Sequence, residues 1–183
     1  MSSFLLSALF AMAKLDLTYQ VAYGESASEI EVVEYYSLSC PKCLQMFNED
    51  FGALKEKYPE IRLVFHPDPA DLLTLQFMVC LEKLEPDLRP IFFETVLECI
   101  YENEGRAGLA ILQSAMEALK VPVPDLGKME FLEKAPAYSA ALRFLIQEDV
   151  ISTVPSYEIN GVLFDAAPTF ASIDKEMQQR KKQ

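Results

Sequence analysis

The sequence predicts a single α/β domain in which one β-sheet is assembled from two segments that lie far apart in the chain. Three observations support this: a strand–helix–strand pattern over residues 29–66, a helical stretch of about 80 residues after it, and a return of β character followed by a helix near the C-terminus. A helical insertion between two halves of one sheet keeps connections short, which two independent domains would not. With 183 residues, the chain can bury a full core.

The first half of the predicted sheet begins at "EIEVVEYYSL", residues 29–38, which is rich in β-branched and aromatic residues and therefore predicts a buried strand. Ser39-Cys40-Pro41 follows, and a proline at the first helical position predicts a helix start because no needed N–H is lost there. A second strand is predicted over 61–66. Strand, helix and strand in one short unit predict that the two strands are parallel.

The middle of the chain is predicted to be all helical. Segments 70–84, 86–102 and 106–120 carry apolar residues at three-to-four spacing, separated by prolines and a glycine. A fourth segment, 129–149, is predicted to break at Pro136.

Two short extended runs then surround Asn160-Gly161, the strongest short-range hairpin signal, and "APTFASIDKEMQQRKK" predicts a closing amphipathic helix.

The N-terminal residues 1–17 admit two interpretations. A short apolar run is followed by Ala11-Met12-Ala13, which has the form of a signal-peptidase site, but no positive charge precedes Lys14. The segment is either an export signal, which we prefer, or an N-terminal helix of the domain. No stretch approaches the roughly 20 apolar residues of a membrane span. The net charge of −12 argues against a nucleic-acid partner, since such a surface repels phosphate.

Cys40 and Cys43 lie three positions apart with Pro41 and Lys42 between them. A zinc site needs four ligands, and the chain has no second pair at this spacing and a single histidine, His66, so no metal is expected. A structural disulfide remains an alternative, but so short a loop constrains little of the unfolded chain. A redox-active pair is therefore preferred.

The predicted helix start supports this preference. Unpaired N–H groups and the helix dipole favour an anion at a helix N-terminus and lower the pKa of a thiol placed there. Cys40 is therefore the expected nucleophile, because the thiolate is the reactive form. Cys43, one turn further in, is expected to be less exposed and to resolve mixed disulfides, while Lys42 adds a positive charge.

"EYYSLSCPKC", taken with the distant "TVPSYEING", resembles the DsbA-like thiol–disulfide oxidoreductases of the thioredoxin superfamily. The resemblance extends over nearly the whole chain from about Thr18. It implies a thioredoxin fold (βαβ…ββα) with an all-helical insertion between the two halves. The halves would be 18–66 and 150–183, and the insertion 67–149.

The resemblance also implies roles for individual residues. Cys40 is similar to the family's nucleophile and Cys43 to its resolving cysteine. Pro155 matches the proline that follows a cis peptide bond in this superfamily, and Val154 is expected to offer its backbone to an extended substrate peptide, with Thr153 beside it.

Glu34, six positions before Cys40, matches the family's buried acidic residue. A carboxyl group buried there would have a raised pKa and could exchange a proton with Cys43. The alternative is that Glu34 points to the other face of its strand and is solvated.

The implied activity is disulfide exchange with unfolded or reduced proteins by a monomeric, exported or periplasmic enzyme. It would need no cofactor beyond its own disulfide, and a membrane oxidase or other redox partner would recharge it. The Pro-Lys dipeptide departs from the Pro-His of the best-known oxidising members, which leaves the oxidising strength open. Alternatives are a reductase or isomerase, a glutathione-linked cytoplasmic enzyme, and a copper-handling or chaperone-like binding module.

Two further residue types have simpler interpretations. Cys80 and Cys99 lie on successive predicted helices, where a second disulfide, as in some family members, and two buried free thiols are both open. His66, at the end of a predicted strand, is expected to be a loop or capping residue.

Overall fold

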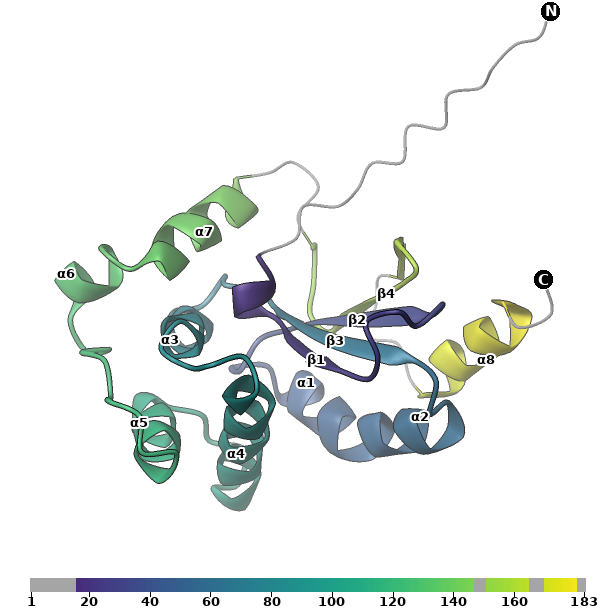
Figure 1. Ribbon diagram of the computed structural model, residues 1–183, viewed down its shortest axis with the longest axis horizontal. Coiled ribbons are helices and arrows are strands. Elements are labelled where there is room, and N and C mark those ends of the chain that lie inside the picture. Colours follow the sequence, from purple (N-terminus) through teal and green to yellow (C-terminus); the bar gives the residue numbers. More distant parts are fainter. Residues whose placement is uncertain (1–15, 147–150, 165–169, 181–183) are drawn as a thin grey trace, which may run out of the picture.

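The computed structural model describes residues 16–146, 151–164 and 170–180, and its centre is a five-stranded sheet of order β1-β3-β2-β4-β5 (Figure 1). The strands are Val21–Tyr23 (β1), Glu31–Tyr36 (β2), Arg62–Pro67 (β3), Ser156–Ile159 (β4) and Val162–Phe164 (β5). β2 and β3 are parallel, as predicted, and the other neighbouring pairs are antiparallel. The sheet therefore joins the two ends of the sequence.

Helices surround this sheet. They are Pro41–Met46 (α1), Gly52–Lys57 (α2), Leu72–Leu81 (α3), Leu88–Glu102 (α4), Leu109–Ala118 (α5), Met129–Leu132 (α6), Pro136–Leu145 (α7) and Phe170–Arg180 (α8). Figure 1 shows α3 to α7 gathered on one side of the molecule, and α8 beside α2. The helical insertion between two halves of a sheet is confirmed, and Pro136 begins a helix as its fixed φ favours.

Two local features differ from the prediction. No strand was predicted before residue 29, but the segment before β2 contains η1 (Leu17–Tyr19) and the edge strand β1. Three residues are too few to show an alternating pattern. The first helix is also interrupted by a π-helical turn over Phe47–Phe51. Apolar spacing does not distinguish this wider turn from an α-helical one, since the same face stays buried.

An aromatic cluster fastens the insertion to the sheet. The ring of Phe93 on α4 lies 5.2 Å from that of Tyr36 on β2 and 5.0 Å from that of Phe65 on β3, measured between centroids. The rings of Phe47 and Phe77 pack against Phe93 as well, at 5.5 and 5.9 Å. One core therefore serves both the sheet and the inserted helices.

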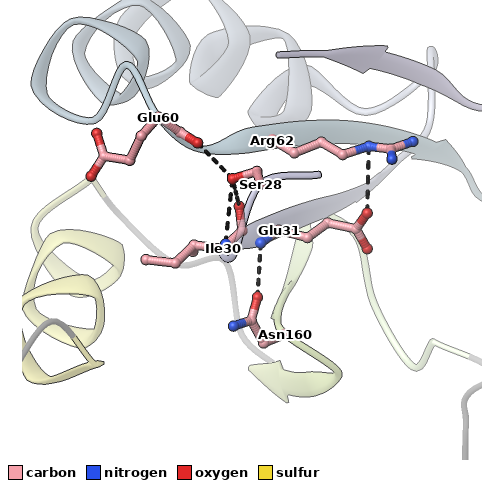
Figure 2. Close-up of polar contacts among 6 residues, drawn as sticks. All are labelled: Ser28, Ile30, Glu31, Glu60, Arg62 and Asn160. Atoms are coloured by element: carbon pink, nitrogen blue, oxygen red, sulfur yellow. Dashed lines mark hydrogen bonds and ion pairs between the residues drawn. The ribbon is translucent and has the colours of Figure 1, made fainter. Parts of the chain in front are cut away.

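The hairpin predicted at Asn160-Gly161 is confirmed, with φ of 48° and 81° at these residues. Figure 2 shows how its turn is held at the start of β2. The Asn160 Oδ1 accepts a hydrogen bond from the Glu31 N–H at 2.8 Å, and its Nδ2 donates to the Glu29 carbonyl at 3.0 Å. Beside it, Ser28 Oγ donates to the Glu60 carbonyl at 2.5 Å (Figure 2). The two Asn160 contacts hold the end of β4 at the start of β2, and the Ser28 contact joins the residues before β2 to those before β3.

His66 is fully buried within β3, so the expectation of a loop or capping residue was wrong. Its ring lies 4.7 Å from that of Tyr35 and 5.1 Å from that of Phe144 on α7. His66 is therefore part of the core on the sheet face covered by α7, because the strand extends one residue further than predicted.

The interpretation of residues 1–17 falls mostly outside the described part of the chain, which begins at Asp16. Across the described ranges, no helix has both the length and the apolarity that crossing a bilayer requires.

Candidate active site

The candidate site forms where β2 ends and α1 begins. Cys40 is the N-cap residue of α1 in an extended conformation, and its sulfur accepts a hydrogen bond from the Cys43 N–H at 3.2 Å. Pro41 occupies the first helical position and, like Lys42, is exposed. The sequence Cys-Pro thus starts the helix and places a sulfur atom at its N-terminus, where the unpaired N–H groups point.

The two thiols have different environments. Cys40 is partly exposed, whereas the side chain of Cys43 is only 3% exposed, as expected. Burial raises the pKa of the Cys43 thiol well above its usual range, and the hydrogen bond with Cys40 acts in the same direction. A backbone hydrogen bond from Ser37 lowers that pKa, and the charges of Cys40 and Glu34 raise it. Cys40 is therefore the thiol that an outside reactant can reach. Both are free thiols in the structure.

The loop before β4 lies against Cys40, although the two are 114 positions apart. The Cys40 thiol approaches the Val154 carbonyl oxygen at 3.7 Å, and the Val154–Pro155 peptide bond is cis. Thr153 is exposed, Val154 is partly exposed and Pro155 is buried. Ser156 Oγ donates to the Thr153 carbonyl at 2.5 Å and holds the loop. The structure thus brings this predicted loop and Cys40 together.

Glu34 is 5% exposed, so the solvated alternative is wrong. It lies opposite Tyr157 in the β2–β4 pairing, and the Tyr157 hydroxyl hydrogen-bonds its carboxyl group. Burial raises the pKa of Glu34 to about 8, because the hydrogen bond from Tyr157, which lowers it, only partly offsets the loss of water, and Asp50 raises it further. The charge of Glu34 also contributes to the raised pKa of Cys43.

The side chains of the remaining predicted residues do not take part in these contacts. Lys42 has no hydrogen-bond or ion-pair partner among the described residues. Cys80 is buried and Cys99 partly exposed, and both are free thiols; burial raises the pKa of Cys80 to about 12. The question whether they form a disulfide, which the sequence left open, stays open. Within the described ranges, no group of three His, Cys, Asp or Glu residues could hold a metal ion.

Sequence reasoning missed a polar network behind the cysteines. Asp71, the N-cap residue of α3, accepts hydrogen bonds from Ser37 Oγ at 2.6 Å and from Ser39 Oγ at 3.0 Å. Thr74 Oγ1 accepts from the Leu38 N–H at 3.1 Å. An aspartate before an apolar helix is a recognisable cap signal, but the contact with the loop before Cys40 depends on how α3 packs.

A pair of cysteines at the start of a helix, a cis-proline loop beside it, and a sheet whose two halves are separated in the chain by inserted helices together define a thioredoxin-fold protein. Comparison of the sequence with known families leads to the same class. A thioredoxin family model matches residues 16–179, so the chain belongs to that family.

Solved structures share the fold. A thioredoxin-like oxidoreductase from Silicibacter pomeroyi superposes with a TM-score of 0.65 at 14% identity, covering 90% of this chain and 94% of that one. Wolbachia pipientis alpha-DsbA1 superposes with a TM-score of 0.65 at 17% sequence identity, covering 90% of this chain and 92% of that one. A protein-disulfide isomerase from Novosphingobium aromaticivorans superposes with a TM-score of 0.60 at 17% sequence identity, covering 88% of this chain and 96% of that one. The expected DsbA-like thioredoxin fold is confirmed. No curated protein matches the chain in sequence.

Proposed function

We propose that this protein is a thiol–disulfide oxidoreductase that exchanges disulfides with protein substrates through Cys40 and Cys43. The observation that carries the proposal is the asymmetry of the pair: Cys40 is accessible and its sulfur accepts an N–H hydrogen bond at a helix N-terminus, while Cys43 is buried. This asymmetry gives each sulfur a separate task, because an attacking group can reach only one of them.

The exchange proceeds in two steps. A substrate thiolate attacks the Cys40 sulfur of the Cys40–Cys43 disulfide, the S–S bond breaks, and Cys43 leaves with the electron pair. A second substrate thiolate then attacks the substrate sulfur of the mixed disulfide, and Cys40 leaves as a thiolate. The substrate gains one disulfide and the protein is reduced by two electrons. The Cys43 N–H stabilises the departing Cys40.

Glu34 supplies the proton that Cys43 needs in the first step. With its pKa raised to about 8 by burial, Glu34 is mostly protonated at neutral pH and can act as a general acid. In the reverse reaction the carboxylate takes the proton back, and Cys43 regains its nucleophilic form. A carboxyl group with an ordinary pKa is ionised at neutral pH and therefore has no proton to donate to Cys43.

Substrate docking is assigned to the loop at Val154. Its carbonyl oxygen already lies beside the Cys40 sulfur, and a backbone at this place can pair with an extended peptide, with exposed Thr153 at the margin. Main-chain pairing is indifferent to side chains, so the substrate class is unfolded or reduced protein.

The direction we favour is oxidation in the periplasm or another exported compartment, by a monomer that a membrane oxidase or other redox partner recharges. No cofactor enters the proposed chemistry. The net charge of −12 disfavours nucleic acid as a partner.

The deciding experiment equilibrates the protein in graded glutathione buffers and measures the fraction of Cys40–Cys43 disulfide, with Cys40→Ser as the control. We expect the wild-type pair to stay reduced until the buffer is strongly oxidising, because an unstable disulfide is one that the protein donates. Cys40→Ser should lose all exchange.

A pair that is already oxidised in reducing buffer would instead indicate a reductase, and exchange retained by Cys40→Ser would refute the assignment of the nucleophile.

A further inference from the structure

A tight turn joins β2 to Cys40, the N-cap residue of α1. The turn closes where the Cys40 N–H donates to the Ser37 carbonyl at 3.1 Å. The peptide before it is held by the continuation of β3, because the Tyr36 carbonyl accepts from the Asp68 N–H at 2.7 Å. The direction in which the chain enters α1 therefore depends on the next peptide, which joins Ser37 to Leu38.

This Ser37–Leu38 peptide is held from both sides. Its carbonyl oxygen accepts from the Cys40 N–H, and its N–H, which belongs to Leu38, donates to Thr74 Oγ1 at 3.1 Å. A peptide unit is planar, so its carbonyl and its N–H turn together. The contact that fixes the Leu38 N–H therefore also fixes the carbonyl that receives Cys40. Leu38 and Thr74 are both fully buried, so an N–H that lost this hydroxyl would be left without a partner at a high cost.

Thr74 is itself held in place at the start of α3. Its backbone N–H donates to Asp71 Oδ1 at 2.9 Å, and its hydroxyl donates to Asp71 Oδ2 at 2.6 Å. Burial raises the pKa of Asp71, but the hydrogen bonds from Ser37 and Thr74 outweigh burial and hold that pKa below its usual value. Asp71 is therefore ionised and can only accept. The proton of the Thr74 hydroxyl is thus committed to Asp71, which leaves the lone pairs of its oxygen for the Leu38 N–H.

We infer that Thr74 is a positioning residue, whose hydroxyl orients the Ser37–Leu38 peptide and thereby the turn that presents Cys40. The inference rests on the proposed function, in which Cys40 reacts as a thiolate. The Cys40 sulfur accepts from the Cys43 N–H at 3.2 Å and lies 3.7 Å from the Val154 carbonyl oxygen. A cap residue keeps such an N–H bond only in the extended conformation in which Cys40 leaves the turn, and this bond is strongest to a charged sulfur. Thr74 acts through the peptide and not on the sulfur itself.

The test measures how fast iodoacetamide alkylates Cys40 in the reduced full-length protein at pH 6 and at pH 9, because this reaction needs the thiolate. Trypsin cleaves after Lys42, so mass spectrometry counts the labels on Cys40 and on Cys43 in separate peptides. Thr74→Val removes the hydroxyl at nearly constant volume, and Thr74→Ser keeps it. Thr95→Val is the matched control, since it removes a hydroxyl that donates to a backbone carbonyl within α4.

We expect Thr74→Val to slow the alkylation of Cys40 about fivefold at pH 6, the effect of weakening one hydrogen bond to a charged atom. The loss should be smaller at pH 9, where a thiol ionises more readily without that bond. Thr74→Ser should stay within about twofold of the wild-type rate, and Thr95→Val should match the wild type. A general loss of stability, which urea unfolding measures separately, would not give a loss of rate that depends on pH.

Alkylation of Cys40 in Thr74→Val at the wild-type rate at pH 6 would overturn the inference. A Thr74→Ser variant as slow as Thr74→Val would overturn it as well, since the hydroxyl would then not be the group that matters. A wild-type Cys40 that iodoacetamide does not label would refute the proposed function, whereas failure of the inference leaves wild-type reactivity intact.

Should Thr74→Val fail to fold, amide hydrogen exchange in the wild-type protein decides. The N–H groups of Leu38 and Cys40 should be protected to within about threefold of each other, because rotation of the Ser37–Leu38 peptide breaks both of their hydrogen bonds at once. A larger difference in protection would mean that the two bonds open independently and would overturn the inference.

Discussion

Glu34 shows how one buried residue sets the pH response of the molecule. An acid whose pKa rises from 4.5 in the unfolded chain to about 8 in the folded state binds more protons when folded between these values. Stability therefore falls as pH rises through this window, and the loss is complete above pH 8. Below pH 4.5 the group is protonated in both states and contributes nothing. Loss of this proton, which we propose is the one that Cys43 receives, makes the protein less stable in alkaline solution.

Replacing Glu34 by Gln should remove this dependence, since an amide of the same size does not titrate. Relative to the wild type, Glu34→Gln should gain about 1 kcal/mol of stability per pH unit between pH 5 and 8. Urea unfolding at pH 5, 6.5 and 8 measures this, with Glu56→Gln on the exposed surface of α2 as the control. Parallel pH profiles for Glu34→Gln and wild type would mean that Glu34 is ionised in the folded protein.

At the scale of elements, the β4–β5 hairpin is set by its turn and by what the turn contacts. Asn160 combines a positive φ, which most residues avoid, with two side-chain hydrogen bonds to the chain around β2, of which Figure 2 shows the one with the Glu31 N–H. The dipeptide Asn-Gly predicts the turn from local conformational preference alone. Its attachment to Glu29 and Glu31 is a tertiary contact that the dipeptide does not reveal.

Two substitutions separate these contributions. Asn160→Gly keeps the positive φ and loses both hydrogen bonds, so it should cost about 1–3 kcal/mol. Asn160→Ala loses the same hydrogen bonds and also places a Cβ in the unfavourable left-handed conformation. It should therefore lower the free energy of unfolding by about 1 kcal/mol more than Asn160→Gly does. Urea unfolding of the two variants measures the difference. Equal stability of Asn160→Ala and wild type would show that the turn contributes nothing to the sheet.

At the scale of the whole molecule, the aromatic cluster around Phe93 makes the insertion and the sheet one cooperative unit. Phe93 comes from the inserted α4, yet its ring packs on Tyr36 of β2 and on Phe65 of β3. The polar network at Asp71 joins the same two parts at the surface of this core. We therefore expect the inserted helices and the sheet to unfold together.

Phe93→Ala should cost about 3–5 kcal/mol, as is typical for deleting a buried aromatic ring, and unfolding should remain a single transition. Far-ultraviolet circular dichroism and tyrosine fluorescence, followed together in urea, measure both properties. Ile91→Ala, on the exposed side of the same helix, is the control and should cost much less. Two separated transitions in the wild type would contradict a shared core.

The sequence by itself determined the order of the elements, the helix start at Cys40-Pro41, the break at Pro136 and the turn at Asn160-Gly161. These are local preferences, governed by φ, capping and apolar spacing, and they need no knowledge of distant residues. Resemblance to a family added Pro155 and the expectation that Glu34 is buried. The short strand β1 and the π turn escaped prediction because neither changes the apolar pattern enough.

The tertiary structure decided the burial, hydrogen bonds and neighbours of the site residues. The burial that separates Cys43 from Cys40, the pairing of Glu34 with Tyr157, and the contact of Asp71 with Ser37 all join segments far apart in the chain. A strand register shifted by one residue would turn Glu34 to the other face, and a differently packed α3 would separate Asp71 from Ser37. A pKa depends on the atoms that surround a group in space, and only the folded chain brings those atoms together.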